Sequence, residues 1–197
     1  MEKSHVLLYP CSMAFPQRYL VRFHPKHTPH VFTDILVVGG GIAGLRSALS
    51  VPDDLRVLVI TKDKIAQSNS SYAQGGIAGV LSPEDRFENH VEDTIVAGAG
   101  LCDRSIVEMV ICEAPEQINN LVSIGTNFDL DEGHIALGKE GGHSHHRIVH
   151  ALGDSTGHEV MRAIIDKARE AKNVEIWEKT FTLDLITHEG RCVGALV

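Results

Sequence analysis

The chain has only four cysteines, and they lie far apart. Cys11, Cys102, Cys112 and Cys192 include no Cys-x-x-Cys pair, so the sequence shows neither a zinc-site spacing nor the cysteine framework of a small disulfide-stabilised protein. Scattered thiols of this kind are typical of a reducing compartment. We therefore expect a cytoplasmic protein with reduced cysteines.

The sequence also lacks a long apolar run and an excess of positive charge. Pro10 interrupts the short apolar run at residues 6–8 before it could form a signal-peptide core, and no stretch reaches the length of a membrane span. The net charge is −8, from 18 Lys and Arg against 26 Asp and Glu, without a local basic cluster. We therefore expect no nucleic-acid partner and no membrane association.

What the chain does contain is enough apolar sequence for a packed core. Apolar residues make up 43% and charged residues 22% of the 197 positions, which is typical of one globular unit. Residues 1–33 differ, because they carry Pro10, Pro16, Pro25 and Pro29 and show no sustained period. We predict an irregular leader over 1–33, in which Met13 is an alternative start, and a domain over 34–197.

A glycine-rich turn directly follows the apolar run at residues 35–38. Its sequence, Gly39-Gly40-Gly41-Ile42-Ala43-Gly44, has the Gly-x-Gly-x-x-Gly spacing between a buried strand and a helix. In that context the first glycine permits a tight turn, the second lets the backbone approach a pyrophosphate, and the third lets the helix pack closely on the sheet. The pattern predicts a dinucleotide ligand.

The remaining patterns predict an α/β fold with a parallel sheet. A helix to about residue 50 and a strand over 56–61 complete one βαβ unit, and a Ser/Gly-rich loop follows at 67–76. We predict helices over 86–99, over 103–124 with Asp103 as N-cap and Gly125 as the stop, and from a capping box at Thr156 and Glu159 to about 172. A strand over 174–178 and a hairpin formed by 181–187 and 192–197 complete the predicted elements.

The helix predicted over 103–124 contains Pro115, where a kink is expected. Its apolar stripe consists of Ile106, Val107, Val110, Ile111, Ala114, Ile118, Leu121 and Val122. The inner face of the later helix is predicted to consist of Val160, Ile164 and Ala168.

A second chemical signal lies between residues 137 and 150. It contains Glu140, followed closely by His143, His145 and His146. Three interpretations remain open: a zinc or iron site, a solvated polar loop, and a loop that brings Glu140 and a few donors against a small charged molecule. We favour the third, because several histidines in so tight a run rarely point at one ion.

Five segments together resemble the L-aspartate oxidase family. They are residues 34–44, 68–79, 90–94, 97–103 and 140–150. The glycine turn is common to many flavoproteins, whereas Tyr72-Ala73-Gln74-Gly75-Gly76-Ile77-Ala78 is similar to the wider succinate dehydrogenase and fumarate reductase superfamily. Glu140 to His145, with Arg147 to His150, is the part that resembles the aspartate oxidase branch.

The resemblance implies a Rossmann-like FAD-binding domain and a flavoenzyme. Members of this family oxidise L-aspartate to iminoaspartate, pass the electrons to oxygen or fumarate, and supply quinolinate synthase in NAD biosynthesis. It also implies non-covalent FAD, because Asn69 stands where covalently flavinylated relatives have a histidine, five residues before Gln74. The alternatives are a succinate dehydrogenase or fumarate reductase type flavoprotein, and a non-catalytic FAD-binding fragment.

The resemblance also assigns site residues. Glu140 would face the substrate ammonium, with a surface ion pair as the alternative role. Lys62 would lie near the adenosine, and the generic dinucleotide pattern leaves Asp63 as a weak ribose candidate. The cofactor-binding residues that the resemblance implies are Gly39, Gly40, Gly41, Ile42, Ala43, Gly44, Lys62, Asn69, Ser70, Ser71, Tyr72, Ala73, Gln74, Gly75 and Gly76.

Members of the family are considerably longer than this chain. The resemblance therefore implies that the last strand of the FAD sheet, the capping domain with the substrate-carboxylate ligands, and a proton-accepting arginine lie beyond Val197. We accordingly expect a domain that is incomplete at its C-terminal end, and we assign no catalytic acid or base.

Overall fold

The computed structural model describes residues 19–21 and 23–197 and divides them between two compact units. The larger unit is Thr33–Phe181, and the smaller one combines the residues up to Phe32 with Thr182–Val197. The expectations for Cys11, Met13 and the apolar run at 6–8 lie outside the described residues. The predicted boundary between a leader and a domain at residue 34 stays a prediction.

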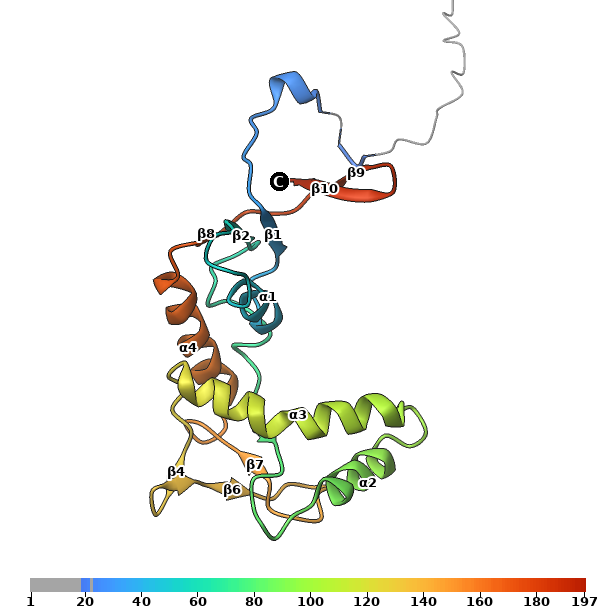
Figure 1. Cartoon of the computed structure of the whole chain (residues 1–197), viewed down its shortest axis with the longest axis vertical. Helices are drawn as coiled ribbons and strands as arrows, with labels where there is room; N and C mark the ends of the chain where they lie inside the picture. The colour runs from blue at the N-terminus through green and yellow to red at the C-terminus, as the bar shows by residue number, and fades with distance from the viewer. Residues whose placement is uncertain (1–18, 22) are drawn as a thin grey trace, which may run out of the picture. The chain divides into compact units, whose positions relative to one another are not determined.

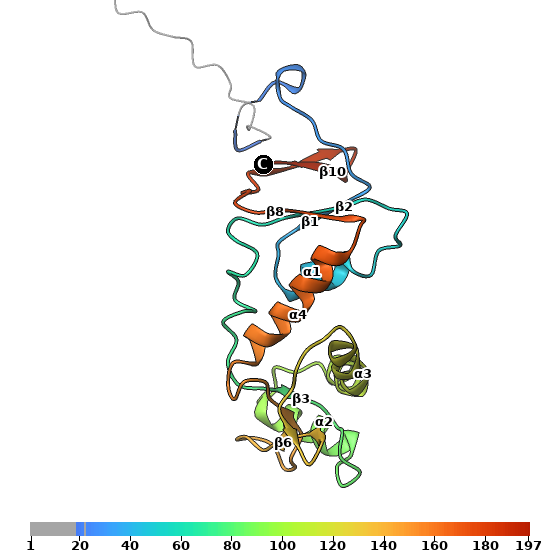
Figure 2. The same ribbon diagram turned by 90° about the vertical axis from the view of Figure 1, so that its left-hand side faces the viewer.

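The larger unit contains the parallel sheet that the sequence predicts. Strands β1 (Ile35–Val38), β2 (Val57–Ile60) and β8 (Val174–Trp177) lie in the order β1-β2-β8, and both pairs are parallel. Helices α1 (Ile42–Ala48) and α4 (Thr156–Glu170) pack on one face of this sheet (Figures 1 and 2). The predicted βαβ unit and α/β fold class are confirmed.

The main core lies between this sheet and the two helices. All four residues of β2 are buried, as expected for the central strand of a covered parallel sheet. The predicted inner face of α4 is confirmed, since Val160, Ile164 and Ala168 are each at most 2% exposed. The buried residues of this core are Leu45, Ala48, Val57, Val59, Ile65, Met161, Ile164, Ile165 and Ala168.

A second, smaller core surrounds Ile118, Phe128, Val149 and Ala151. Around it lie helices α2 and α3 and several very short strands (Figure 1). The sequence did not predict these strands, because alternation cannot be recognised over two residues. The elements are α2 (Phe87–Ala97), α3 (Arg104–Ser123), the antiparallel sheet of β3 (Ile77–Ala78), β7 (Ile148–Val149) and β6 (Leu137–Gly138), and the pair β4 (Leu130–Asp131) and β5 (His134–Ile135).

The predicted ends of α3 are confirmed. The Asp103 carboxylate accepts the amide of Ser105 at 2.9 Å, as an N-cap does, and the helix stops before Gly125. The apolar stripe is only partly confirmed. Ile111 and Ile118 are buried, but others on the stripe remain exposed, among them Ile106 at 52%, Val110 at 56% and Val122 at 45%. The sequence pattern shows which face is apolar and not how much of that face is covered.

The capping box predicted for α4 is wrong. The helix does begin at Thr156, but Ser155 occupies the N-cap position and its side chain makes no capping hydrogen bond. The Thr156 hydroxyl instead accepts the amide of Ala151 at 3.0 Å, and Glu159 accepts the amide of Asn127 at 2.8 Å. The two side chains therefore bind the amides of Ala151 and Asn127, which lie before the helix, and do not cap the helix itself.

The smaller unit contains the predicted hairpin, formed by β9 (Asp184–His188) and β10 (Arg191–Leu196). Glu189 and Gly190 both have positive φ, +47° and +76°, which is typical of a tight hairpin turn. The Asp184 carboxylate accepts the amide of Leu20 at 2.6 Å, and a 3-10 turn, η1, spans Pro25–His27. Among the described residues, no helix is long and apolar enough to cross a membrane.

Candidate functional site

The glycine turn has the geometry that its sequence predicts. Gly39 has a φ of +112°, and its amide donates to the carbonyl of Ile60 at 2.8 Å, which ties the turn to the neighbouring strand. A Cβ at Gly44 would overlap the carbonyl oxygen of Gly39 and lie 3.2 Å from Val37 Cγ1. Gly44 therefore lets α1 pack directly against the end of β1.

The middle of the turn offers backbone donors. A Cβ at Gly40 would overlap Ile65, whereas one at Gly41 would meet only the Ser70 hydroxyl at 3.4 Å. The Ile42 amide donates to that hydroxyl at 3.3 Å. Within the described part of the chain, the amides of Gly40, Gly41 and Ala43 have no protein acceptor. Gly40 is buried, whereas Gly41 is half-buried and Ala43 is exposed. The turn thus presents free N–H groups at its accessible end, which is the chemistry that binds a phosphate anion.

Lys62 and Asp63 lie at the same edge of the sheet as the glycine turn, because β1 and β2 are parallel and both end there. The Thr180 amide donates to the Thr61 carbonyl at 2.9 Å and so continues the pairing beyond the strands. Lys62 is exposed. The Asp63 carboxylate accepts the amide of Lys64 at 2.8 Å, so it is partly engaged locally.

The Ser/Gly-rich loop is held against the first turn of α4. The Gly157 amide donates to the Ala73 carbonyl at 3.1 Å, and the Gly75 amide donates to the Asp154 carbonyl at 3.2 Å. A Cβ at Gly157 would overlap the Ser70 carbonyl and lie 2.7 Å from the Ala73 carbonyl oxygen. Only glycine permits so close an approach of the loop to the helix.

A cavity of about 200 Å³ lies between the loop, the start of α1 and the start of α4. This volume is below the roughly 300–1,000 Å³ typical of small-molecule sites, so the cavity would hold part of a dinucleotide. Six of the predicted residues line it: Ile42, Ser70, Ala73, Gln74, Gly75 and Gly76. The sequence interpretation missed Ile77, Thr156, Gly157, Val160 and Met161, which also line it.

The other predicted residues do not line this cavity. Asn69 and Tyr72 are exposed, the latter at 62%, and the Tyr72 hydroxyl donates to the Gln67 side chain. Ser71 is buried and bonds to Ser68 through its amide at 3.1 Å and its hydroxyl at 3.0 Å. Of the lining residues that the sequence interpretation missed, only Gly157 could have been recognised. It is a glycine in the first turn of a strongly amphipathic helix.

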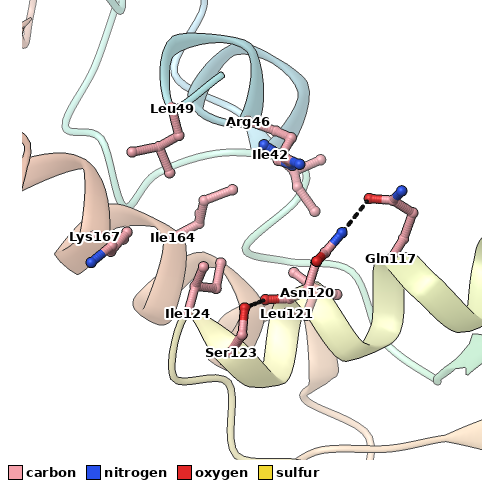
Figure 3. Close-up of a pocket in the computed structure, with 10 residues that line it drawn as sticks. All are labelled: Ile42, Arg46, Leu49, Gln117, Asn120, Leu121, Ser123, Ile124, Ile164 and Lys167. Atoms are coloured by element: carbon pink, nitrogen blue, oxygen red, sulfur yellow. Dashed lines mark hydrogen bonds between the residues drawn. The ribbon is translucent and has the colours of Figure 1, made fainter. Parts of the chain in front are cut away.

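A larger cavity of about 370 Å³ lies between α1, α3 and α4, as Figure 3 shows. Ile42 is the one predicted cofactor residue in its lining. Two of its polar side chains bond within α3: Asn120 donates to Gln117 at 3.4 Å, and Ser123 donates to the Asn120 carbonyl at 2.7 Å (Figure 3). The Ser/Gly-rich loop lines the smaller cavity and not the larger one, which favours the smaller cavity as the dinucleotide site.

Glu140 lies beside the loop and pairs with a histidine. Its Oε1 atom is 2.9 Å from His150 Nε2 and 3.9 Å from the position of a Cβ on Gly75. The Glu140 side chain is 51% exposed and that of His150 is 25% exposed. Within the described residues, Glu140 forms no ion pair with Lys or Arg. The structure thus places a carboxylate next to the loop that lines the smaller cavity.

The histidine-rich segment surrounds a buried arginine. Arg147 has no exposed side-chain surface and binds Asp85 through two hydrogen bonds, at 2.7 and 2.9 Å, and Asp93 through a third at 2.6 Å. The Nδ1 atoms of His143 and His145 lie 3.4 and 3.5 Å from its guanidinium. A guanidinium in this position repels a second cation, and no cluster among the described residues could hold a metal ion. Arg147 orders this segment, and the sequence interpretation did not foresee that role.

Burial and hydrogen bonding together set the charges of this cluster. Burial raises the pKa of Asp93, but hydrogen bonds from the Ser144 amide and hydroxyl and from Arg147 outweigh it and lower the pKa to about 2. The pKa of Asp85 is lowered in the same way, mainly through Arg147, against the effect of burial. Burial lowers the pKa of His90, whose Nδ1 atom has no hydrogen-bond partner in the part of the chain that the structure describes. The carboxylates are therefore charged and His90 is neutral at pH 7.

Comparison with known proteins shows which family this chain resembles. The FAD binding domain family matches residues 34–197. L-aspartate oxidase, chloroplastic, from Arabidopsis thaliana is 46% identical over 159 residues, which cover 80% of this chain and 24% of that protein. L-aspartate oxidase from Streptomyces coelicolor is 42% identical over 178 residues, covering 88% of this chain and 30% of that protein. The chain therefore spans about a quarter to a third of the length of these relatives.

Solved structures show the same fold. E. coli quinol fumarate reductase FrdA superposes with a TM-score of 0.78 at 25% identity, over 83% of this chain and 28% of that one. The Mycobacterium smegmatis Sdh1 complex gives a TM-score of 0.75 at 29% identity, over 83% of this chain and 30% of that one. Together with the glycine turn at the end of β1 and the match over 34–197, these similarities show that the chain belongs to the FAD binding domain family and that its cofactor is FAD.

Proposed function

We propose that this chain binds FAD without a covalent bond along the carboxyl edge of the parallel sheet. The free amides of Gly40, Gly41 and Ala43 would hold the pyrophosphate, and the cavity beside loop 70–76 would hold part of the flavin side. Lys62, exposed at the end of β2, would lie toward the adenosine. The observation that carries the proposal is the glycine turn, in which the amides of Gly41 and Ala43 are accessible and lack a protein acceptor among the described residues, while the Ser70 hydroxyl engages the Ile42 amide.

We further propose that the whole protein oxidises L-aspartate to iminoaspartate. The support comes from relatives named L-aspartate oxidase, at 40–47% identity, and from Glu140 beside the loop. The chemistry that FAD supplies when bound is acceptance of a hydride equivalent from the substrate α-carbon. Glu140 would pair with the substrate ammonium, because a carboxylate attracts a cation that L-aspartate carries and succinate lacks.

Oxygen or fumarate is the proposed final electron acceptor, and quinolinate synthase is the proposed partner that receives iminoaspartate. The fumarate reductase among the similar structures supports fumarate. The names of plant relatives include the word chloroplastic, whereas those of bacterial relatives do not. A cytoplasmic location is therefore part of this proposal. Subcellular fractionation with an antibody against the chain tests the location.

A second candidate is a succinate dehydrogenase or fumarate reductase type flavoprotein, which the structural similarity to Sdh1 and FrdA favours. Glu140 separates the two functions. A carboxylate facing the substrate repels a dicarboxylate that has no ammonium group, so it favours an amino acid as substrate.

FAD binding is tested on the purified chain. Titration with FAD, FMN and NAD should give saturable binding for FAD alone, followed by flavin or protein fluorescence. Acid precipitation of the FAD-loaded chain should then release the flavin into the supernatant. Yellow colour that stays in the pellet, or a preference for FMN or NAD, would contradict the proposal.

The substrate is tested in a chimera, in which residues 34–197 replace the matching part of the Arabidopsis thaliana relative. We expect peroxide release with L-aspartate. Glu140→Gln should lower the ratio of aspartate oxidation to fumarate reduction by about tenfold to a hundredfold, since a charge-assisted hydrogen bond contributes about 1.5–3 kcal/mol. Glu113→Gln, an exposed change on α3, serves as the control. Equal losses of both activities would assign Glu140 a structural role.

A further inference from the structure

We propose that His150 is the positioning residue for Glu140, and this inference rests on the proposed function of Glu140 as the contact for the substrate ammonium. The first observation is the 2.9 Å hydrogen bond between His150 Nε2 and Glu140 Oε1. An ionised carboxylate can only accept, so Nε2 carries the proton and donates it. This bond engages one carboxylate oxygen and leaves Oε2 without a protein partner among the described residues.

The second observation is a slot that fits the imidazole ring. A Cβ on Gly138 would lie 3.0 Å from His150 Cε1, and a Cβ on Gly76 would lie 3.0 Å from His150 Cδ2. Both distances are tighter than ordinary side-chain contacts, so a side chain at either glycine would crowd the ring, and at Gly76 it would also overlap Ile148 and the Val149 carbonyl. The slot is independent of the hydrogen bond, and the two glycines lie close to the ring at Cε1 and at Cδ2.

The backbone around His150 is fixed as well. His150 follows β7 directly, and its carbonyl accepts the amide of Asp129 at 2.8 Å. Glu140 instead lies just after β6, in an exposed turn where the amide of His143 donates to the Glu140 carbonyl at 3.2 Å. A carboxylate that is half exposed would otherwise sample several rotamers. A ring held by β7, Gly76 and Gly138 therefore selects the rotamer that keeps Glu140 beside the loop.

In this arrangement the two oxygens of Glu140 have different roles. Oε1 is held by His150, and Oε2 is presented for the ammonium of the substrate. Loss of the His150 hydrogen bond would leave the charge of Glu140 in place and remove its orientation. The expected defect is therefore in binding of the amino substrate, and it depends on Glu140 being a carboxylate.

The pairing is tested first in the purified chain, without activity. In a long-range ¹H–¹⁵N spectrum, the resonance that His150→Gln removes identifies the His150 ring. Glu140→Gln should shift its Nε2 signal, whereas Glu113→Gln should leave it in place, and the ring of His146, which contacts the Leu137 carbonyl, should respond to neither change. An unchanged His150 signal in Glu140→Gln would overturn the inference.

The role is tested next in the chimera. His150→Phe keeps a flat ring in the slot and removes the donor, so it should raise KM for L-aspartate by about tenfold and change kcat much less. His150→Gln, which keeps an N–H donor, should recover most of that loss. In the Glu140→Gln background, His150→Phe should have little further effect, because the two residues act through one interaction.

Two outcomes separate the failure of this inference from failure of the proposed function. Additive effects of His150→Phe and Glu140→Gln in an active chimera would overturn the positioning role and leave aspartate oxidation intact. A chimera that reduces fumarate and does not oxidise L-aspartate would overturn the proposed substrate, and the positioning role with it. The spectrum of the purified chain decides the pairing in either case.

Discussion

Glu159→Gln tests how much the buried carboxylate that links α4 to Asn127 contributes to the stability of the larger unit. The Glu159 side chain is 5% exposed and accepts two hydrogen bonds from Arg162, each at 2.8 Å, and two from Asn127, at 2.8 and 3.0 Å. Hydrogen bonding from Arg162, opposed by burial and helped by the Asn127 amide, lowers its pKa from 4.5 to about 2. The shift corresponds to at most about 3 kcal/mol of unfolding free energy.

The pH dependence has a definite sign. A carboxylate whose pKa is lowered by folding stabilises the folded state fully above its unfolded pKa of 4.5 and loses this contribution as the pH falls toward 2. At pH 7 we expect Glu159→Gln to lower the free energy of unfolding by about 2 kcal/mol, because glutamine keeps the shape and some hydrogen bonds. Since glutamine does not titrate, the difference should fall by about 1.4 kcal/mol between pH 7 and pH 3.5, to about 0.6 kcal/mol.

The assay is urea unfolding followed by circular dichroism at pH 7, 4.5 and 3.5. Glu170→Gln is the matched control on the same helix, since Glu170 pairs with Lys167 at 3.4 Å but is 70% exposed. An exposed pair of this kind contributes less than about 0.5 kcal/mol. A difference between wild type and Glu159→Gln that does not change from pH 7 to pH 3.5 would refute the reasoning.

Three further changes test the site. Gly157→Ala should weaken FAD binding about tenfold or more, because its Cβ would displace loop 70–76. Gly141→Ala, which has open space around it, should leave the affinity unchanged. Equal affinities of the two variants in an FAD titration would contradict this expectation. Gly44→Ala should destabilise the chain by about 1–3 kcal/mol, measured as a lower urea midpoint, because a Cβ there meets backbone. Arg147→Lys should lower the free energy of unfolding by about 1–3 kcal/mol in the same assay, because an ammonium cannot form both hydrogen bonds to Asp85. An unchanged urea midpoint would show that this bidentate contact does not contribute to stability.

The features that the sequence predicted correctly depend on neighbouring residues. The turn at Gly39 needs a positive φ, the amide of Ser105 needs a cap at Asp103, and the turn at Glu189 and Gly190 needs two residues of positive φ. Each requirement is met within a few positions of the chain. The parallel sheet follows from the same kind of pattern, since a short βαβ connection permits little else.

The tertiary structure alone decided which distant residues meet. Arg147 binds Asp85 and Asp93, which lie 62 and 54 positions away, and His150 reaches Glu140 through a slot that two unrelated glycines leave open. Glu159 likewise serves Asn127 rather than the cap of its own helix. Hydrogen bonds across such separations form only when the elements have packed, because burial makes every unpaired donor or acceptor costly and selects the partner that lies within reach.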